Sequence, residues 1–546
     1  MAGRLLVPAL LVLLYAAARA SRLVGECLWF DEIFGVHAAA HDWHGLWSFV
    51  AADLIHPPLF YALLKVWVAA GGESLLWLEL FAYATSLLCL VPFLLLAREL
   101  RLGLAATRVA LLLFAAAGYF IKYAQEVRMY ALLLLLALTS LWLFARLSGG
   151  GRPTWRRLAG LGLVNLLLVY THYYGWLVVC GEAVYLAAAR DWRRLRAFLP
   201  TAVAAAAGFA PWAWACAAAA GEGGGLAENV GWIARPTFAE ALGFYAQLQE
   251  PFYFRQSSAD PLFGWVGTLL GAVTIGLPLA LLLLRSLRRP RRAREAADAH
   301  NGRAREAAAP DAARPAGEES AARFLAFFAL FPVVVSFAAS HLLPHAVWGT
   351  RHLIVAAGPY ALLAGLGVAG LRPRLLRGAA VGVLVCWYAV AGALALARPQ
   401  VNFVWCAWGQ LAGRTFRSEA EAAGAADVYA FEDLAAYQLW HELRGEGGRF
   451  RLHVVKGVDG ITEDPSFFLP RRFGGVERVT ADALSGEQFW VAFRDASYDE
   501  TRPPMSLLRG RGYAAVRRHE TAAQGQRVFL VLVAREGAER PAPPGP

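Results

Sequence analysis

Charged residues are scarce in this sequence. Only 17% of its 546 residues are Asp, Glu, Lys or Arg, whereas about a quarter of a typical soluble protein is charged. The mean hydropathy is +0.44, and the apolar residues fall in long blocks rather than in the amphipathic stripes of soluble helices. The scarcity of charge therefore excludes an ordinary soluble enzyme and favours a membrane protein.

Other absences narrow the class further. The six cysteines include no C-x-x-C pair, which excludes a disulfide scaffold and a zinc ribbon. The sequence has no convincing Gly-rich phosphate loop, no Ser-His-Asp order and no D-x-D motif for a nucleotide sugar. No stripe of Lys and Arg interleaved with aromatic residues lies in a soluble segment, so we expect no nucleic-acid partner.

The long apolar blocks are the main feature that is present. A block of roughly 18 or more apolar residues spans the hydrocarbon core of a bilayer. We predict eleven spans, at residues 5–24, 75–97, 104–121, 128–146, 158–172, 175–189, 197–217, 263–285, 324–343, 353–370 and 378–398. The fold class is therefore an all-α polytopic membrane protein with about 11 transmembrane helices.

The arginines predict the orientation of these spans. Cytoplasmic loops concentrate Lys and Arg, and here every second connection is basic, at 98–108, 146–157, 190–196, 285–323 and 372–377. The amino terminus is then cytoplasmic and the region after the last span lies outside. The net charge of +11 is a signal of topology. The first block also imitates a secretory signal, with Ala18-Arg19-Ala20 before Ser21, but we expect it to be retained.

Composition divides the chain near residue 398. Residues 1–398 form the predicted membrane domain, with a first outer loop at 25–74, a second outer loop at 218–262 and a disordered cytoplasmic loop at 286–322. The first outer loop is expected to hold a helix from Glu32 to Val50. A juxtamembrane helix from Leu59 to Ala70 should begin sharply after His56-Pro57-Pro58, because proline is accepted in a first turn.

The region after residue 398 is expected to be a soluble α/β domain at 399–536, followed by a disordered Pro/Gly tail at 537–546. Helical and strand-like patterns alternate in it. The expected elements are helices at 405–423, 433–444 and 504–509 and strands at 428–431, 450–455, 489–493 and 528–533. Cys27 and Cys406 both fall on the outer side, so the topology is compatible with one bridge between them.

Two adjacent carboxylates, Asp31 and Glu32, follow the first span in an apolar chain. Carboxylates at such a place are costly unless they carry chemistry or meet water. They are the candidate catalytic residues, with a general base accepting a proton from an attacking hydroxyl group. The alternative is a solvated pair that caps the helix after it.

The run from Tyr123 to Tyr130 lies at the predicted outer junction of two spans. It places Arg128 at the membrane surface, where the guanidinium can bind a lipid-linked phosphate through two parallel hydrogen bonds. The alternative is an arginine that extends to the interface and pairs with Glu126. Other outer polar residues are candidate substrate-binding groups, with Lys122 as a further cationic neighbour: His56, Lys65, Tyr123, Gln125, Glu126, His172 and Arg351.

Three histidines, His37, His41 and His44, recur at helical spacing in the first outer loop. On one helix face they would suit a metal ion, whereas histidines that face headgroups and water give the same pattern. The predicted site therefore includes no metal ligand, and dependence on a divalent metal stays open.

Residues 29–147 resemble bacterial members of the GT-C glycosyltransferase superfamily, which are related to protein O-mannosyltransferases and lipid A aminoarabinose transferases. Four elements carry the resemblance: Asp31-Glu32, His56-Pro57-Pro58-Leu59, the run from Gln125 to Tyr130, and Gly349-Thr350-Arg351-His352. The resemblance implies juxtamembrane helices in the first outer loop and Asp31 as the catalytic carboxylate. The usual late motif has an aromatic residue after the arginine, and His352 stands there in this chain.

The expected function is transfer of a hexosyl or pentosyl group, with inversion, from a polyprenyl-phosphate sugar to a glycan, lipid or protein acceptor. The expected location is the outer face of a bacterial plasma membrane, and the product would belong to the cell envelope. The alternative is a transporter or flippase of lipid-linked saccharides, which polar groups strung through the middle of the membrane would favour. A third hypothesis is a structural anchor for the outer domain, which leaves the clustered polar residues unexplained.

Overall fold

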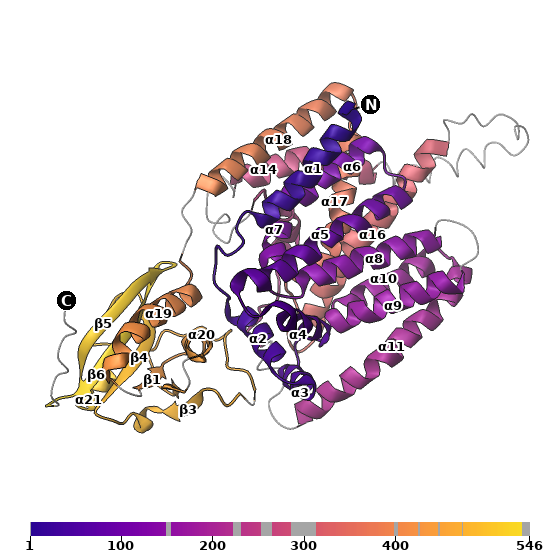
Figure 1. The fold of residues 1–546 in the computed structure, drawn as a ribbon. Coiled ribbons are helices and arrows are strands. Elements are labelled where there is room, and N and C mark those ends of the chain that lie inside the picture. Colours follow the sequence, from indigo (N-terminus) through magenta and orange to yellow (C-terminus); the bar gives the residue numbers. More distant parts are fainter. Residues whose placement is uncertain are drawn as a thin grey trace, which may run out of the picture. The chain divides into compact units, whose positions relative to one another are not determined.

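Figure 1 shows the computed structural model of the chain, which describes residues 2–148, 154–221, 231–252, 265–284, 313–397, 402–423, 426–445, 448–471 and 473–537. Its contacts divide into two compact units. The membrane unit comprises residues 1–23 and 54–398, and the sheet unit comprises residues 24–53 and 399–546. Residues 25–53, which we predicted to be part of the membrane domain, thus cluster with the carboxyl-terminal region.

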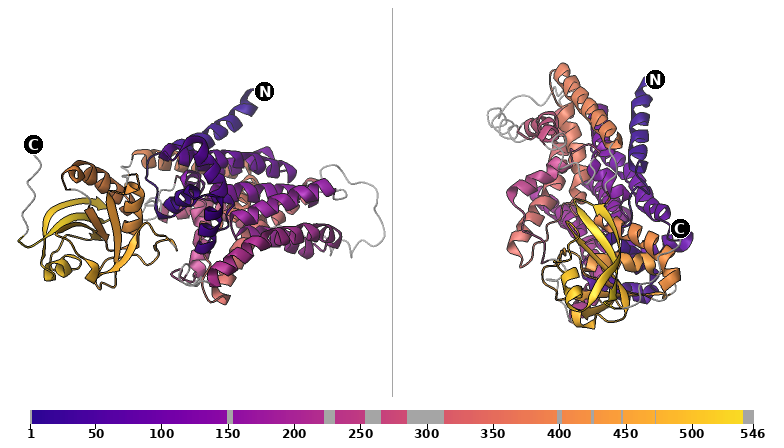
Figure 2. Two further views of the ribbon diagram at one scale, coloured as in Figure 1. Left: turned by 60° about the horizontal axis from the view of Figure 1, so that its bottom comes forward. Right: turned by 90° about the vertical axis from the view of Figure 1, so that its left-hand side faces the viewer.

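The membrane unit is helical, and its helices are visible from two further directions in Figure 2. Six described helices are long and apolar enough to cross a membrane, and shorter apolar helices accompany them. The helices are α1 (Ala2–Ala20), α4 (Leu59–Gly71), α5 (Leu75–Glu99), α6 (Leu104–Ala116), α7 (Gly118–Gln125), α8 (Tyr130–Ser148), α9 (Trp155–Thr171), α10 (Gly175–Ala188), α11 (Trp192–Gly221), α13 (Phe238–Gln247), α14 (Gly267–Gly271), the π-helix η3 (Ala272–Gly276), α16 (Ala313–Leu342), α17 (Ile354–Ala369) and α18 (Arg374–Ala397).

Each of the eleven predicted spans corresponds to helix in the structure, but the third is interrupted. Residues 104–121 were predicted to be one span, whereas α6 ends at Ala116 and α7 begins at Gly118. Ala117 forms an antiparallel β-bridge with Pro251, and the Gly118 N–H donates to the Glu250 carbonyl oxygen at 2.8 Å. The helix breaks because the segment after α13 takes the backbone groups that would continue it.

Arg19 joins the end of α1 to the end of α6. Its Nη2 donates to the carbonyl oxygen of Phe114 at 2.8 Å and its Nη1 to that of Ala115 at 3.2 Å. A cation at a helix carboxyl terminus satisfies carbonyl groups that have no partner within the helix. Arg19 is fully buried, so its hydrogen bonds hold the end of α1 against the end of α6.

A buried polar network joins α8, α9 and α10. Ser140 Oγ lies 2.6 Å from Asn165 Oδ1 and 2.7 Å from Glu182 Oε1, and Asn165 Nδ2 donates to Glu182 Oε2 at 2.7 Å. All three side chains have no exposed surface. Polar groups in hydrocarbon must be satisfied inside the protein. The network therefore restricts how these three helices rotate against one another, and their ends carry several candidate site residues.

The sheet unit is an α/β domain with a six-stranded sheet in the order β3-β2-β1-β4-β6-β5. Its strands are β1 (Ala426–Ala430), β2 (Phe450–Lys456), β3 (Glu477–Thr480), β4 (Gln488–Asp495), β5 (Tyr513–Ala523) and β6 (Gln526–Arg535), and its helices are α2 (Phe30–Ala40), α3 (Trp43–Asp53), α19 (Val404–Ala423), α20 (Asp433–Leu443), the 3-10 helix η5 (Ala481–Ala483) and α21 (Met505–Gly510). Strands β1 to β4 pair in parallel, and β6 pairs antiparallel with β4 and β5.

The sequence analysis predicted the four buried strands of this sheet and missed its two edges. Strand β3 is short and mostly exposed. Strand β5 carries charged side chains, and little of it is buried. Edge strands often carry charge instead of an apolar face, because charge discourages pairing with other chains. They therefore lack the alternation by which the central strands were found.

The structure describes only part of the two loops predicted at 286–322 and 218–262. Residues 313–322 were predicted to be disordered, and that is wrong, because they form the first part of α16. In the second outer loop, 231–252 are described and contain α13. Residues 285–312, 222–230, 253–264 and 538–546 lie outside the described residues.

Candidate functional site

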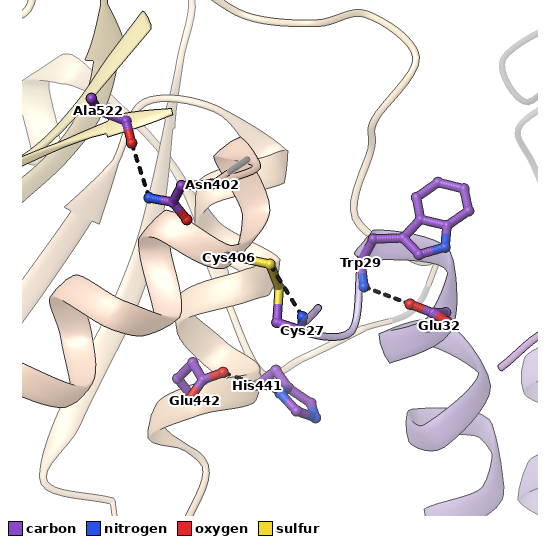
Figure 3. Close-up of a disulfide and its surroundings, with 8 residues drawn as sticks. All are labelled: Cys27, Trp29, Glu32, Asn402, Cys406, His441, Glu442 and Ala522. Carbon is purple, nitrogen blue, oxygen red and sulfur yellow. Dashed lines mark hydrogen bonds and ion pairs between the residues drawn. A yellow bond between two sulfur atoms is a disulfide. The ribbon is translucent and has the colours of Figure 1, made fainter. Parts of the chain in front are cut away.

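The candidate base Asp31 lies in the first turn of α2, within the sheet unit. A disulfide between Cys27 and Cys406 ties the segment before α2 to α19 (Figure 3). The Trp29 backbone N–H donates to Glu32 Oε2 at 2.9 Å, which the same figure shows. Glu32 is buried and closes the first turn of its own helix, whereas Asp31 is half-buried. The two adjacent carboxylates therefore have different surroundings.

Aromatic side chains hold α2 against α20 and the loop after β2. The ring of Phe30 lies 4.9 Å from that of Tyr437 and 5.2 Å from that of Phe467. His37 Nδ1 lies 3.0 Å from the Tyr437 hydroxyl oxygen, and its ring lies 4.5 Å from that of Trp440. Aromatic pairs of this kind are worth about 0.5–1.5 kcal/mol each beyond their buried area. The disulfide and these rings together fix the first turn of α2.

The burial of His37 in these contacts predicts that the protein loses stability at low pH. Burial lowers the pKa of His37 to about 3, so the unfolded chain binds the proton more readily and stability falls as the pH drops below about 6.5. At pH 5 the loss from His37 is about 2 kcal/mol. Thermal unfolding of the purified protein at pH 7 and pH 5 should show a smaller acid-induced loss for His37→Phe than for the wild type. An equal loss in both would contradict the assignment to His37.

The three histidines of this region do not share a helix face. The predicted helix from Glu32 to Val50 breaks after Ala40, so His37 lies in α2, His41 ends it and His44 lies in α3. The break occurs because Asp42 Oδ1 accepts the Gly45 N–H at 2.6 Å and starts a new helix. Nδ1 of His37 already contacts the hydroxyl group of Tyr437. The rings of His37 and His41 lie 5.0 Å apart, but His44 belongs to another helix, so the three do not form the single helix face that suggested a metal site.

In the membrane unit, Arg128 is the centre of a polar cluster between α7 and α8. Its Nη1 donates to the Tyr61 hydroxyl oxygen of α4 at 3.4 Å, and its Nη2 lies 3.5 Å from Nδ1 of His56. The Arg128 backbone N–H donates to the Glu126 carbonyl oxygen at 2.7 Å, which forms a tight turn between the two helices. Arg128 is only 3% exposed. A guanidinium buried to this degree is held in place for a ligand or a partner charge.

Three histidines from separate loops meet beside this arginine. His56 precedes α4, His172 follows α9 and His352 precedes α17. The ring of His172 lies 5.2 Å from that of His56 and 4.6 Å from that of His352. Burial lowers the pKa of His172 to about 3 and the pKa values of His56 and His352 well below 6.5, and the charges of Arg128 and Arg351 act in the same direction. The cluster therefore combines guanidinium charge with neutral imidazole rings.

A row of tyrosines continues this cluster. The ring of Tyr123 lies 4.9 Å from that of Tyr119 and 4.9 Å from that of Tyr130, and the ring of Tyr130 lies 6.2 Å from that of His352. The Tyr119 hydroxyl donates to the Thr350 carbonyl oxygen at 2.7 Å. The candidate residue Tyr123 is thus one ring of an aromatic wall that connects α7, α8 and the loop before α17.

The remaining candidate residues have distinct places. Gln125 Nε2 donates to the Arg19 carbonyl oxygen at 2.9 Å, so its amide supports the packing of α1. Glu126 is buried where α7 ends. Lys65 follows Tyr61 by four residues in α4, which puts both on one side of that helix. Lys122 lies over the ring of its neighbour Tyr123, with 5.2 Å from Nζ to the ring centroid.

The structure therefore gathers His56, Arg128, His172 and Arg351 from the predicted set, and it adds two residues. Tyr61 had no signal beyond a place in an apolar helix. For His352 the sequence did offer a signal, because this histidine follows Arg351 at a position where the motif usually has an aromatic residue. Its proximity to His56 and His172 comes from the packing of loops that are far apart in the sequence.

Two solved structures of ArnT from Cupriavidus metallidurans are similar to this chain over nearly its full length. The structure bound to undecaprenyl phosphate has a TM-score of 0.57 and 13% sequence identity, and the match covers 96% of this chain and 97% of that chain. The apo structure has the same TM-score and coverage, with 15% identity. The archaeal oligosaccharyltransferase AglB from Archaeoglobus fulgidus, in complex with an inhibitory peptide and a dolichol-phosphate, matches 80% of this chain with a TM-score of 0.41 and 13% identity.

No protein-family model and no curated protein matches the sequence. The likeness in structure shows that this chain has the fold of ArnT. The fold class predicted from the sequence is thereby confirmed, and the chain is a multi-pass membrane protein.

Proposed function

We propose that this protein transfers a glycosyl group from a polyprenyl-phosphate sugar to an acceptor hydroxyl group. The observation that carries the proposal is the cluster of the buried residues Arg128, His56 and His172 with the half-buried Arg351, which offers cationic charge and hydrogen-bond donors at the ends of membrane helices. A guanidinium binds phosphate oxygens with charge-assisted hydrogen bonds. The fold agrees, because ArnT of the same fold has been solved with undecaprenyl phosphate bound.

In the proposed reaction, Asp31 accepts the proton of the acceptor hydroxyl as its oxygen attacks the anomeric carbon of the sugar. The bond from that carbon to the phosphate oxygen breaks, and the polyprenyl phosphate leaves with the bonding electrons. Attack opposite the leaving group inverts the anomeric centre. Arg128 stabilises the phosphate as it gains charge, and Lys65 or Lys122 supplies further positive charge near it.

Glu32 has another role in this proposal. Its carboxylate already accepts the backbone N–H of Trp29 and lies buried in the first turn of α2. We assign it to holding that turn, which leaves Asp31 as the base. The hydroxyl group that Asp31 activates belongs to a glycan, a lipid or a protein, and the sugar is a hexose or a pentose.

We place the transfer on the outer face of a bacterial plasma membrane, with the amino terminus in the cytoplasm. The alternating arginine loops support this orientation. The disulfide between Cys27 and Cys406 also supports it, because disulfides persist in oxidising compartments such as the periplasm. Reporter fusions after Arg289 and after Val401 should give opposite signals, cytoplasmic for the first and periplasmic for the second. Matching signals would mean that the number of spans is wrong by one.

The donor class is tested directly with the purified protein in detergent. One reaction offers a nucleotide sugar and a second offers a polyprenyl-phosphate sugar, each with a mixture of glycan and lipid acceptors. We expect glycosyl transfer only from the lipid donor, with release of polyprenyl phosphate. Turnover of the nucleotide sugar alone would overturn the proposal, and movement of the lipid-linked saccharide across a vesicle membrane without transfer would favour a flippase.

A further inference from the structure

The histidine cluster of the membrane unit contains buried nitrogen atoms without partners. Nε2 of His56, of His172 and of His352 is buried and has no hydrogen-bond partner among the described residues. One ring nitrogen from each histidine lies within 4.8 Å of the others. An unsatisfied buried polar atom is costly, and three of them in one cluster point to a ligand that supplies what they lack.

The neighbours of two rings decide which nitrogen carries the proton. Nδ1 of His172 accepts the backbone N–H of Tyr174 at 3.0 Å. Nδ1 of His56 faces Nη2 of Arg128 at 3.5 Å, and a guanidinium only donates hydrogen bonds. A neutral imidazole that accepts at Nδ1 must carry its proton at Nε2. His56 and His172 therefore each carry a buried N–H donor at Nε2 that has no acceptor among the described residues.

This distribution of protons separates two ligand chemistries. A metal ion binds the lone pair of an imidazole nitrogen, and the other ring N–H then donates to a neighbour. His56 and His172 have the opposite arrangement, because Nδ1 of each ring accepts a hydrogen bond and Nε2, which lacks a partner, carries the proton. The guanidinium groups of Arg128 and Arg351 act on the same rings and would repel a cation. An oxygen with negative charge accepts N–H donors and is attracted by the guanidinium groups.

We propose that His56 and His172 supply neutral N–H donors to an oxygen of a phosphoryl group, with Arg128 beside them and His352 as the third ring of the cluster. The inference rests on the proposed function and specifies how the site recognises the phosphate of its donor. Arg128 supplies the charge, and the imidazoles of His56 and His172 supply hydrogen bonds without adding charge. The shared chemistry is a phosphate oxygen, whether the phosphate belongs to a lipid or is free in solution.

Substitution by Gln or by Leu distinguishes a donor from a metal ligand. The Gln side-chain amide retains an N–H donor at nearly the reach of histidine Nε2, but it is a poor ligand for Zn²⁺. Leu removes the donor at similar volume. His172→Gln and His172→Leu are compared in the full-length protein in detergent, with the same pair at His56. His345→Leu serves as the matched control, because His345 lies in the same loop region as His352 but outside the cluster.

Binding is measured with undecaprenyl phosphate, with undecaprenol, which lacks the phosphate, with inorganic phosphate and with Zn²⁺. We expect the Leu variants to bind undecaprenyl phosphate about ten- to a hundredfold more weakly than the wild type. The Gln variants should recover most of the affinity, and undecaprenol binding should not change. Competition by inorganic phosphate at millimolar concentration would identify the phosphate alone as the recognised group, and its absence would show that the lipid is needed with it.

The possible failures are distinguishable. If the wild type does not bind undecaprenyl phosphate, the proposed function fails as well. If it binds and the Leu variants of unchanged melting temperature bind equally well, only the receptor inference fails. Stoichiometric Zn²⁺ binding that both Gln and Leu abolish would overturn it in favour of a trihistidine metal centre.

Discussion

Turnover of the Asp31→Asn variant is expected to fall about 10²–10⁴-fold, which is the usual cost of losing a general base. Asn has the size of Asp and keeps a carbonyl oxygen, but its amide cannot accept the proton of an attacking hydroxyl group. The disulfide and the rings that seat α2 do not involve the Asp31 carboxylate. Folding and donor binding should therefore stay close to those of the wild type, and the measurement is the initial rate of glycosyl transfer under donor saturation.

Two matched variants make this result specific. Asp42→Asn changes a carboxylate in the same segment that caps α3, and it should leave the rate within a few-fold of the wild type. Glu32→Gln keeps an oxygen that can accept the Trp29 N–H and should have a similarly small effect. A rate for Asp31→Asn within a few-fold of the wild type, with a large loss for Glu32→Gln, would move the base to Glu32.

The affinity for the lipid donor is expected to fall about ten- to a hundredfold in Arg128→Ala, because a charged hydrogen bond to phosphate contributes roughly 1.5–3 kcal/mol. Arg128→Lys should recover only part of this loss. An ammonium keeps the charge but does not present two parallel N–H groups to the phosphate oxygens. The measurement is equilibrium binding of a polyprenyl phosphate to the purified variants.

Because Arg128 is buried, its removal also leaves Tyr61 and His56 without the guanidinium that they contact. The melting temperature of each variant therefore accompanies its affinity. Arg98→Ala is the control, since Arg98 is an exposed arginine of α5 in a predicted cytoplasmic connection. Arg128→Ala with normal melting and normal donor affinity would refute the phosphate role of this residue.

Local sequence patterns determined the helical membrane fold of this protein. The apolar blocks predicted its spans because the bilayer requires a fixed length of apolar helix. The sharp start of α4 after His56-Pro57-Pro58 also follows from local chemistry, because proline restricts the residue before it and fits the first turn. The central strands of the sheet were predicted in the same way, from the short apolar runs between turn residues.

Tertiary contacts decided the features that those patterns did not show. The third span breaks at Ala117 because a segment at Pro251 pairs with it. This pairing cannot be predicted from residues 104–121 alone. Residues 24–53 cluster with the carboxyl-terminal domain through a disulfide to Cys406 and through the ring of Tyr437. The sequence suggested Cys406 as a partner on grounds of topology alone.

The candidate site divides in the same way. Asp31 and Arg128 were proposed from the sequence because a charge beside an apolar span is conspicuous where charge is costly. The sequence did not predict that His56, His172 and His352 form a cluster. They are separated from one another by more than a hundred residues, and contact with water explains any single histidine in an outer loop. Only packing brought their unsatisfied nitrogens together, and only the hydrogen bonds of His172 and His56 showed which atoms carry the protons. Proton positions depend on neighbours in space, which a linear sequence does not specify.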